Sequence, residues 1–319
     1  MKILGSRSTS GLASPMRLWE KPTPMPPLTA NLSLASDSNA IVADALKRLS
    51  TIATLPEVTA KIVSTVEDPR SSAANLHKIV AHDPALATRI LKVVNSAFYG
   101  LPGQIGSVER AIVLLGLNAI KNIAVAASLG QLFRGVKLTD QFTAKDLWTH
   151  CIAVAVTARE LARQMKAPIA DEAFLAGLIH DVGLLVSLQL WPDKLRAACD
   201  AASTSEQPFT DIEREIVGAD HQQLGQGLAE LWKFPRSCQL VAGFHHKPTA
   251  LHDNNRLLVT LVYVADTLCC QHNRGFNLTA LRQNLDEAGL SDIRLDPQLI
   301  TQTAAKLDEL VGNATAVLG

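Results

Sequence analysis

The sequence has few aromatic residues and no excess of charge of either sign. Phe, Trp and Tyr make up 4% of the 319 residues, and 30 Lys and Arg residues balance 30 Asp and Glu residues. Because no basic excess is present to displace counterions from phosphates, we expect no nucleic-acid partner. Hydrophobic residues make up 47% of the chain and charged residues 19%, which excludes wholesale disorder. The composition predicts a neutral, aliphatic, globular protein.

Cysteine is also scarce, and its spacing is not that of a disulfide framework. The chain has five cysteines, an odd number, and no C-x-x-C pair, which is typical of reduced thiols in a cytosol. We interpret the vicinal Cys269 and Cys270 as two small apolar residues on a buried helix. The sequence from Met1 to Leu4 turns polar at once and lacks the apolar run of a signal peptide. These features predict a cytoplasmic chain.

One apolar segment, residues 111–133, is long enough to cross a bilayer. It contains Lys121, and a lysine at the centre of a membrane span costs about 2.5–3.5 kcal/mol on insertion. A buried core helix explains the same pattern without that cost. We therefore predict a core helix here and no membrane segment.

The apolar periodicity of the chain is helical. Residues 1–38 contain five prolines among polar residues and are predicted to be a flexible lead-in. From residue 40 onward apolar residues recur every three to four positions, and Asp-Pro pairs at 68–69, 83–84 and 296–297 are typical helix starts. No segment alternates with the two-residue period of a strand. The pattern predicts an all-α fold, with helices that include residues 108–133, 147–165, 171–190, 212–218, 221–232, 235–246 and 256–271.

Histidine and aspartate residues stand out within these predicted helices. His180 and Asp181 follow a fully apolar helix face, where a charged pair is costly unless it is satisfied. Imidazole and carboxylate together suit a divalent metal, and helical bundles build metal sites from ligands on several helices. The candidate ligands are His150, His180, Asp181, His221, His245, His246 and Asp266.

Each of these residues alone also has a structural interpretation. His150 is equally explained as a hydrogen-bonded core histidine, and His221 as a helix-terminal group. Asp266 is equally explained as the partner of Arg256 or of a backbone amide. The residue pattern by itself leaves metal binding and these structural roles open.

A series of motifs runs in order from near Leu49 to Pro248. Its most specific blocks are His82–Leu86 and Val94–Gly100. Further members of the series are Leu55-Pro56, Asp68-Pro69, Ile105, Ser107, Leu115-Gly116, Ala173–Gly183, Glu213, Glu215, Gly218, Asp220-His221, Gly225, Trp232, Pro235 and His245-His246. In this order the motifs resemble those of the HDOD domain.

The resemblance implies a multi-helix HDOD fold in two lobes. An N-terminal helical lobe would cover residues 39–140, an HD-like helical lobe residues 141–275, and a C-terminal helical extension residues 276–319. HDOD domains are relatives of the HD-type metal-dependent phosphohydrolases and generally act as signalling modules that often lack a working active site. We therefore expect a stand-alone bacterial regulatory protein that binds signalling proteins, because no receiver or cyclase domain is recognisable in the sequence.

The resemblance extends to the metal ligands of the HD superfamily. The H…HD…D set of the HD phosphohydrolases is matched by His150, His180, Asp181 and Asp266. The additional ligands of the two-metal HD-GYP phosphodiesterases are matched by His221, His245 and His246. The resemblance thus implies one or two divalent ions, iron, manganese or zinc. No P-loop or dinucleotide-binding glycine motif is present, so no organic cofactor is expected.

The alternative function is a phosphohydrolase that acts on a nucleotide or a cyclic dinucleotide, with Asp181 as a catalytic residue. A metal-bound water of lowered pKa would then attack phosphorus. Two departures from the HD-GYP pattern favour the regulatory function. Leu184 stands where those enzymes have a lysine, and no Gly-Tyr-Pro motif follows His246. We expect Leu184 and Val186 to block a substrate if they pack over the site.

Overall fold

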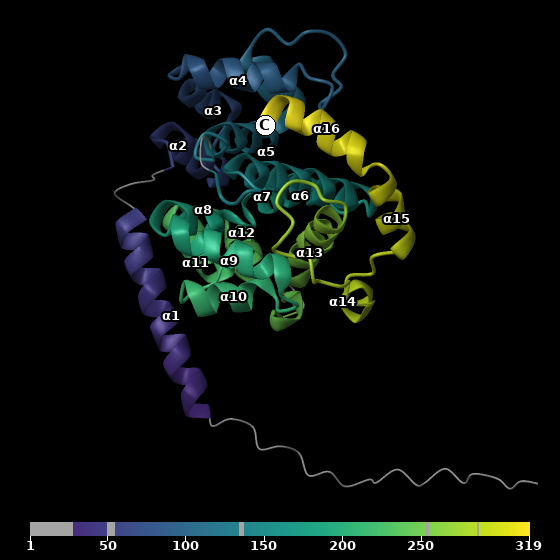
Figure 1. Ribbon diagram of the computed structural model, residues 1–319. Helices are drawn as coiled ribbons and strands as arrows, with labels where there is room; N and C mark the ends of the chain where they lie inside the picture. The colour runs from purple at the N-terminus through teal and green to yellow at the C-terminus, as the bar shows by residue number, and fades with distance from the viewer. Residues whose placement is uncertain (1–27, 50–54, 134–136, 253–254, 286) are drawn as a thin grey trace, which may run out of the picture. The chain divides into compact units, whose positions relative to one another are not determined.

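The computed structural model describes residues 28–49, 55–133, 137–252, 255–285 and 287–319. The chain divides into a unit of residues 1–36 and a compact unit of residues 37–319, and the site described below lies wholly in the second unit. All regular elements of the described ranges are helices, which confirms the predicted all-α fold (Figure 1). Residues 1–27 of the predicted flexible segment lie outside the described residues, whereas residues 28–38 begin the first helix.

Figure 1 shows the described helices in their order along the chain. They are α1 (Leu28–Leu49), α2 (Glu57–Glu67), α3 (Ala73–Ala81), α4 (Pro84–Val94), α5 (Val108–Leu129), α6 (Ala144–Gln164), α7 (Ala170–Ile179), α8 (Val182–Leu190), α9 (Pro192–Thr204), α10 (Phe209–Ile216), α11 (His221–Leu231), α12 (Arg236–Phe244), the 3-10 turn η1 (Pro248–Ala250), α13 (Arg256–Gln271), α14 (Glu287–Asp292), α15 (Pro297–Ala305) and α16 (Leu307–Leu318).

Helices α2, α3 and α4 all pack against α5. Helix α4 starts as predicted, because the Asp83 side chain accepts a hydrogen bond from the Leu86 amide and Pro84 occupies the first helical position. The predicted start at Asp68 is wrong. Asp68 ends α2, and α3 begins four residues later at a capping box formed by Ser72 and Asn75.

Helices α6 to α13 surround a second part of the core. Helix α6 packs against α7 and α13, and α11 packs against α8 and α12. The continuous helix predicted over residues 171–190 is wrong, because the chain breaks at His180 and Asp181 between α7 and α8. Helix α9 was not predicted, although Pro192 stands at its first position.

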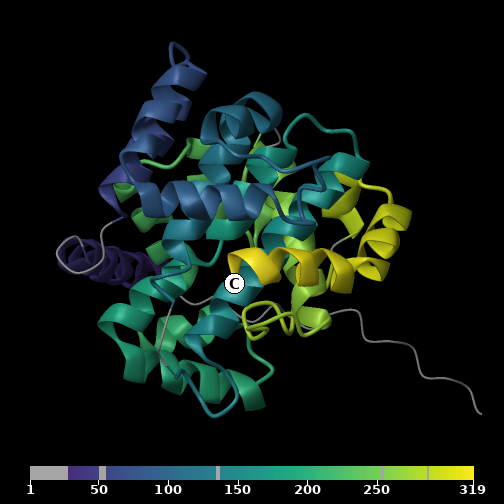
Figure 2. The ribbon, with the colours of Figure 1, turned by 90° about the horizontal axis from the view of Figure 1, so that it is seen from above.

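The last two helices return to the earlier part of the chain. Helices α15 and α16 pack against α6, and α16 also contacts α4, as both views of the ribbon show (Figures 1 and 2). The Trp148 indole of α6 donates a hydrogen bond of 2.8 Å to the Leu318 carbonyl. This bond attaches the C-terminal extension to the helix that carries His150.

Two segments of the described chain are long and apolar enough to cross a membrane. They are Val108–Leu129, 61% buried inside the protein, and Ala170–Leu190, 89% buried. Helix α5 contains a kink at Gly116 with φ of 84°, and the second segment is broken at His180. Both segments therefore serve as core helices here, as predicted for α5.

Candidate metal centre

The fold brings all seven predicted ligands into one cluster in the core of α6 to α13. His150 comes from the middle of α6, and Asp266 from the middle of α13. His221 is the first residue of α11. The α7–α8 break supplies His180 and Asp181, and the end of α12 supplies His245 and His246.

The short break between α7 and α8 allows α8 to lie close to α11. A Cβ atom added at Gly183 would lie 1.9 Å from the His221 carbonyl oxygen and 2.7 Å from the Gly225 amide nitrogen. Only glycine fits this contact between the two backbones. The Gly183 position thus sets the distance between Asp181 and His221.

Each of the five histidines has its Nδ1 atom occupied by a partner outside the cluster. The Nδ1 atoms of His150, His180 and His245 lie 3.3, 2.8 and 3.0 Å from backbone carbonyl oxygens. Those of His221 and His246 lie 2.5 Å from a Glu213 carboxylate oxygen and 2.8 Å from the Gln283 amide oxygen. Because these oxygens can only accept, Nδ1–H donates to them and Nε2 faces the cluster. In the neutral form of each ring Nε2 carries the lone pair, as a metal ligand requires, and His150 Nε2 also lies within hydrogen-bonding distance of Asp266 Oδ1.

The Nε2 atoms face one another at short range. His221 Nε2 lies 3.3 Å from His245 Nε2 and 3.0 Å from His246 Nε2. Lone pairs at these separations repel unless a cation or a proton lies between them. His180 Nε2 has no hydrogen-bond partner although its residue is fully buried. The arrangement is that of metal ligands whose outer nitrogens are fixed by the surrounding protein.

The two aspartates complete this arrangement. Asp181 Oδ1 lies 3.4 Å from His221 Nε2 and 3.3 Å from His245 Nε2, and its Oδ2 lies 3.4 Å from His180 Nε2. Asp266 Oδ1 lies 3.0 Å from His150 Nε2. Asp181 thus belongs to two groups of possible ligands. In each group the ligand atoms lie within 4.8 Å of one another. The first group adds His221, His245 and His246 to Asp181, and the second adds His150 and His180.

The charge of the cluster fits a divalent ion. Asp181 and Asp266 are 2% and 0% exposed, and both oxygens of Asp181 and Oδ2 of Asp266 lack a hydrogen-bond donor. Burial of an ionised carboxylate costs several kcal/mol per ion when it is not compensated. One divalent cation would balance both carboxylates and leave the imidazoles neutral, the form in which histidine ligates metals.

The pKa shifts of the side chains reflect the same crowding. Burial opposes ionisation of Asp181, but the neighbouring His180 and His221 hold the pKa of its carboxyl well below its usual range. Burial also opposes protonation of His221, yet the carboxylates of Glu213 and Asp181 raise its pKa to about 10. The pKa of His246 falls well below its usual range, because it is buried beside two other histidines.

The cluster is buried. Its most exposed member is His246, with 8% of its side chain exposed. Leu184 and Val186 are fully buried as well, and that they block a substrate stays a prediction. Asp266 faces His150, whereas Arg256 donates a hydrogen bond to Asp292, so the proposed Arg256 partner of Asp266 is wrong.

The sequence analysis missed the residues that orient the ligands. Glu213 accepts hydrogen bonds from both the ring and the backbone amide of His221. Gln283 accepts from His246 and donates to Thr267 Oγ1 at 2.6 Å. Glu213 was visible only as a motif residue eight positions before His221, and Gln283 lies beyond the motifs.

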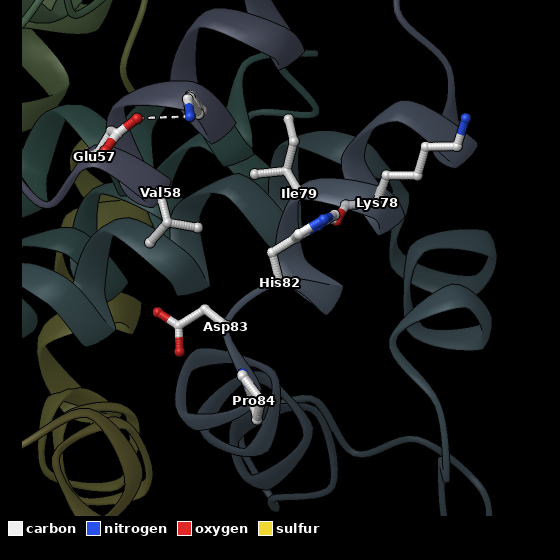
Figure 3. A pocket seen from close by; sticks show the side chains of 8 residues that line it. Glu57, Val58, Lys78, Ile79, His82, Asp83 and Pro84 are labelled. Carbon is white, nitrogen blue, oxygen red and sulfur yellow. Dashed lines mark hydrogen bonds and ion pairs between the residues drawn. The ribbon is translucent and has the colours of Figure 1, made fainter.

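A separate hollow of about 500 Å³ lies on the surface of the α2–α4 group, lined by residues of α2, α3 and the start of α4 (Figure 3). Figure 3 shows Glu57 at the start of α2, and His82 and Asp83 between α3 and α4. The Glu57 carboxylate pairs with Lys61 at 2.6 Å. The side chains that line the hollow come from other elements than the seven clustered ligands. This hollow is therefore separate from the buried centre.

The fold is identified by the match of the sequence to a protein family. The sequence model of the HDOD domain matches residues 52–248, more than half of the chain. The chain belongs to the HDOD family. The matched range ends two residues after His246, so Asp266, Gln283 and the C-terminal helices lie beyond the HDOD match.

Solved structures with this fold include other HDOD proteins. An HDOD domain protein of unknown function from Geobacter sulfurreducens is 20% identical, with a TM-score of 0.67, over 86% of this chain and 99% of its own. A protein from Marinobacter aquaeolei, named as a candidate signal transduction protein, is 24% identical with a TM-score of 0.73, over 91% of this chain and 68% of its own. One from Shewanella amazonensis, named as a candidate phosphohydrolase, is 22% identical with a TM-score of 0.66, over 86% and 98%. These likenesses show the shared HDOD helical fold.

A curated relative from Treponema pallidum has no described function. It is 24% identical over 241 residues, which are 75% of this chain and 46% of the relative. The chain thus spans about half the length of that relative.

Proposed function

We propose that this HDOD chain is a bacterial regulatory protein of the cytoplasm that binds signalling proteins and holds one or two divalent ions as part of its fold. The supporting observation is a complete set of seven ligands that is enclosed, with at most 8% of any of their side chains exposed. A phosphoester substrate must reach a metal-bound water, whereas a structural ion needs no such access.

In this proposal some residues bind the ion and others orient the residues that bind it. His150, His180 and Asp266 hold one side of the centre, and the α11 and α12 histidines hold the other, with Asp181 shared between them. A bound divalent ion supplies positive charge and Lewis acidity at this position. Glu213 holds the Nδ1 proton of His221, so that Nε2 stays free to ligate. Iron, manganese and zinc all accept such imidazole and carboxylate donors.

The proposed partner surface is on the α2–α5 group. Val113 and Leu114 of α5 are 73% and 51% exposed, next to the kink at Gly116. Adjacent exposed apolar side chains are typical of protein-binding sites. The loop after α4 is held in place by Asn95, the C-cap of α4. Its side chain accepts a hydrogen bond from the Ile105 amide at 2.6 Å and donates one to the Ile105 carbonyl at 2.9 Å.

A turnover assay of the metal-loaded chain tests this proposal. The chain, loaded separately with manganese, iron or zinc, is incubated with cyclic dinucleotides and with an activated phosphodiester, and products are separated by chromatography. We expect no turnover above that of an Asp181→Asn variant. Metal-dependent turnover that the variant lacks would contradict the regulatory proposal.

That result would favour the second candidate, a two-metal phosphohydrolase. The observation in its favour is the position of Asp181, whose two oxygens face different groups of histidines, with Oδ1 3.3 Å from His245 Nε2 and Oδ2 3.4 Å from His180 Nε2. A carboxylate between two ions is a common feature of such hydrolases. Access to this enclosed site would then require movement of the side chains around Leu184.

A further inference from the structure

Cys270 differs from the other cysteines of the chain in its surroundings. All five cysteines are buried and free. Cys270 is the one whose sulfur belongs to a group of possible metal ligands in the described chain, together with His150 and Asp266. The sequence analysis interpreted Cys269 and Cys270 alike, as small apolar residues. The structure separates the two.

The sulfur of Cys270 faces the cluster because Cys270 follows Asp266 by one helical turn on α13. Cys270 Sγ lies 3.5 Å from Asp266 Oδ1, and that oxygen lies 3.0 Å from His150 Nε2. Zinc bonds of about 2.0–2.3 Å place neighbouring tetrahedral ligand atoms roughly 3.3–3.6 Å apart. Two of the three separations are thus close to those of ligands on one ion, and all three donor atoms lie within 4.8 Å of one another.

A further donor lies next to Asp266, although it is grouped with His150 and His245 rather than with Cys270. His180 Nε2 is buried without a hydrogen-bond partner and lies 3.8 Å from Asp266 Oδ1. On its other side the Cys270 sulfur receives a hydrogen bond from the Ala280 amide and lies 3.9 Å from Thr279 Oγ1. Burial and the carboxylates of Asp266 and Asp181 hold the pKa of the Cys270 thiol well above its usual range, and the thiol donates to Asp266 Oδ1, so a thiolate forms here only when a cation binds.

We propose that Cys270 is a thiolate ligand of the ion held by His150, His180 and Asp266. The inference rests on the proposed metal centre and specifies its chemistry. On ligation the sulfur–hydrogen bond breaks, a sulfur–metal bond forms, and the proton passes to the buffer. The H…HD…D set then gains a soft sulfur donor, so this side of the centre prefers zinc, ferrous iron or cobalt to magnesium and manganese.

Cys269 provides a matched control on the same helix. Its sulfur lies 3.5 Å from Thr157 Oγ1 of α6, and it belongs to none of the ligand groups. A Cys269→Ser change thus alters a buried cysteine next to Cys270 without removing a donor from the centre. Both variants keep a small polar side chain in place of the thiol.

The test is cobalt titration of the full chain, the Cys270→Ser variant and the Cys269→Ser variant, each followed by absorption spectroscopy and elemental analysis. A thiolate ligand gives a sulfur-to-cobalt charge-transfer band in the near ultraviolet. We expect this band in the wild type and in Cys269→Ser, and its loss in Cys270→Ser, which still retains cobalt with an affinity ~10-fold or more weaker. Cobalt bound by the wild type without the band, or a band that survives in Cys270→Ser, would overturn the ligand assignment alone. No cobalt in the wild type would overturn the metal centre as well.

X-ray absorption of the zinc-loaded wild type keeps the test independent of variant folding. A sulfur shell at about 2.3 Å beside nitrogen and oxygen is expected. A shell of nitrogen and oxygen alone would overturn the role of Cys270 even if neither cysteine variant folds.

Discussion

The two helical groups of the molecule have cores of different character. Among the described residues of α2–α5, Lys121 is the one buried titratable side chain, and it pairs with Glu67 at 2.5 Å. The α6–α13 group instead buries four histidines, two aspartates and Glu213 in one place, with the half-buried His246 beside them. The first group is stabilised by apolar packing, whereas the second contains charge that its own side chains leave partly unsatisfied.

This difference indicates where the proposed metal would act. Loss of an ion should leave α2–α5 intact and weaken α6–α13, because the uncompensated carboxylates lie only in the second group. Conversely, the exposed apolar residues of α5 should affect partner binding without affecting the metal. The following predictions test this division, from the largest expected effect to the smallest.

Removal of the ion should have the largest effect. A ligand at about 1,000 times its dissociation constant stabilises a fold by about 4 kcal/mol. We therefore expect chelation to lower the melting temperature markedly and re-addition of metal to restore it. Hydrogen exchange followed by mass spectrometry should show faster exchange in α6–α13 and unchanged exchange in α2–α4. Identical melting curves with and without chelator would contradict the division.

Gly183→Ala should separate α8 from α11. The new Cβ would meet the His221 carbonyl oxygen at 1.9 Å, and overpacking of this kind costs typically ~1–3 kcal/mol. We expect a lower denaturation midpoint together with weaker metal binding, because His221 moves with its backbone. Gly312→Ala on α16 is the control, since its Cβ meets nothing within 4 Å, and it should be neutral or stabilising. Equal stability of the two variants would show that the close contact is unimportant.

Glu213→Gln should weaken metal binding without unfolding the chain. The amide accepts less strongly from His221 Nδ1, and loss of such an orienting partner typically lowers metal affinity ~10–100-fold. Competition titration with a chromogenic chelator measures the change. Glu215→Gln, two residues away and exposed, is the matched control and should bind metal like the wild type. An unchanged metal affinity of the Glu213→Gln variant would show that His221 is not a ligand that Glu213 orients.

A Val113→Asn, Leu114→Asn variant should have the smallest effect on the fold. Surface changes away from special features usually alter stability by less than about 0.5 kcal/mol. We expect an unchanged melting temperature and metal content, together with reduced crosslinking to whichever protein the wild type captures. Equal crosslinking of the variant and the wild type would show that the partner surface does not include this part of α5.

The sequence was sufficient to single out the seven residues of the cluster, because each is a polar residue on an otherwise apolar helix or part of an ordered motif. His180-Asp181 and His245-His246 are examples. Local patterns were misleading where two signals compete. Asp68-Pro69 has the composition of a helix start, but the capping box of Ser72 defines the next helix.

The orienting residues could not be predicted, because their roles depend on tertiary packing. Gln283 reaches His246 from 37 residues further along the chain, and nothing in its neighbourhood marks it. The same holds for Cys270, since sequence alone does not distinguish its orientation from that of Cys269. The break at His180 was also hidden, because apolar residues continue on both sides of it.

The most direct test of the account is elemental analysis of the chain purified without chelators or a His-tag. Two variants are compared with it. The cluster variant carries both His180→Ala and Asp181→Ala, and the control is Asp193→Asn, whose side chain is 93% exposed. We expect near-stoichiometric iron, manganese or zinc in the wild type and in Asp193→Asn, and its loss from the cluster variant. A metal-free wild type, with a cluster variant that folds equally well, would contradict the account.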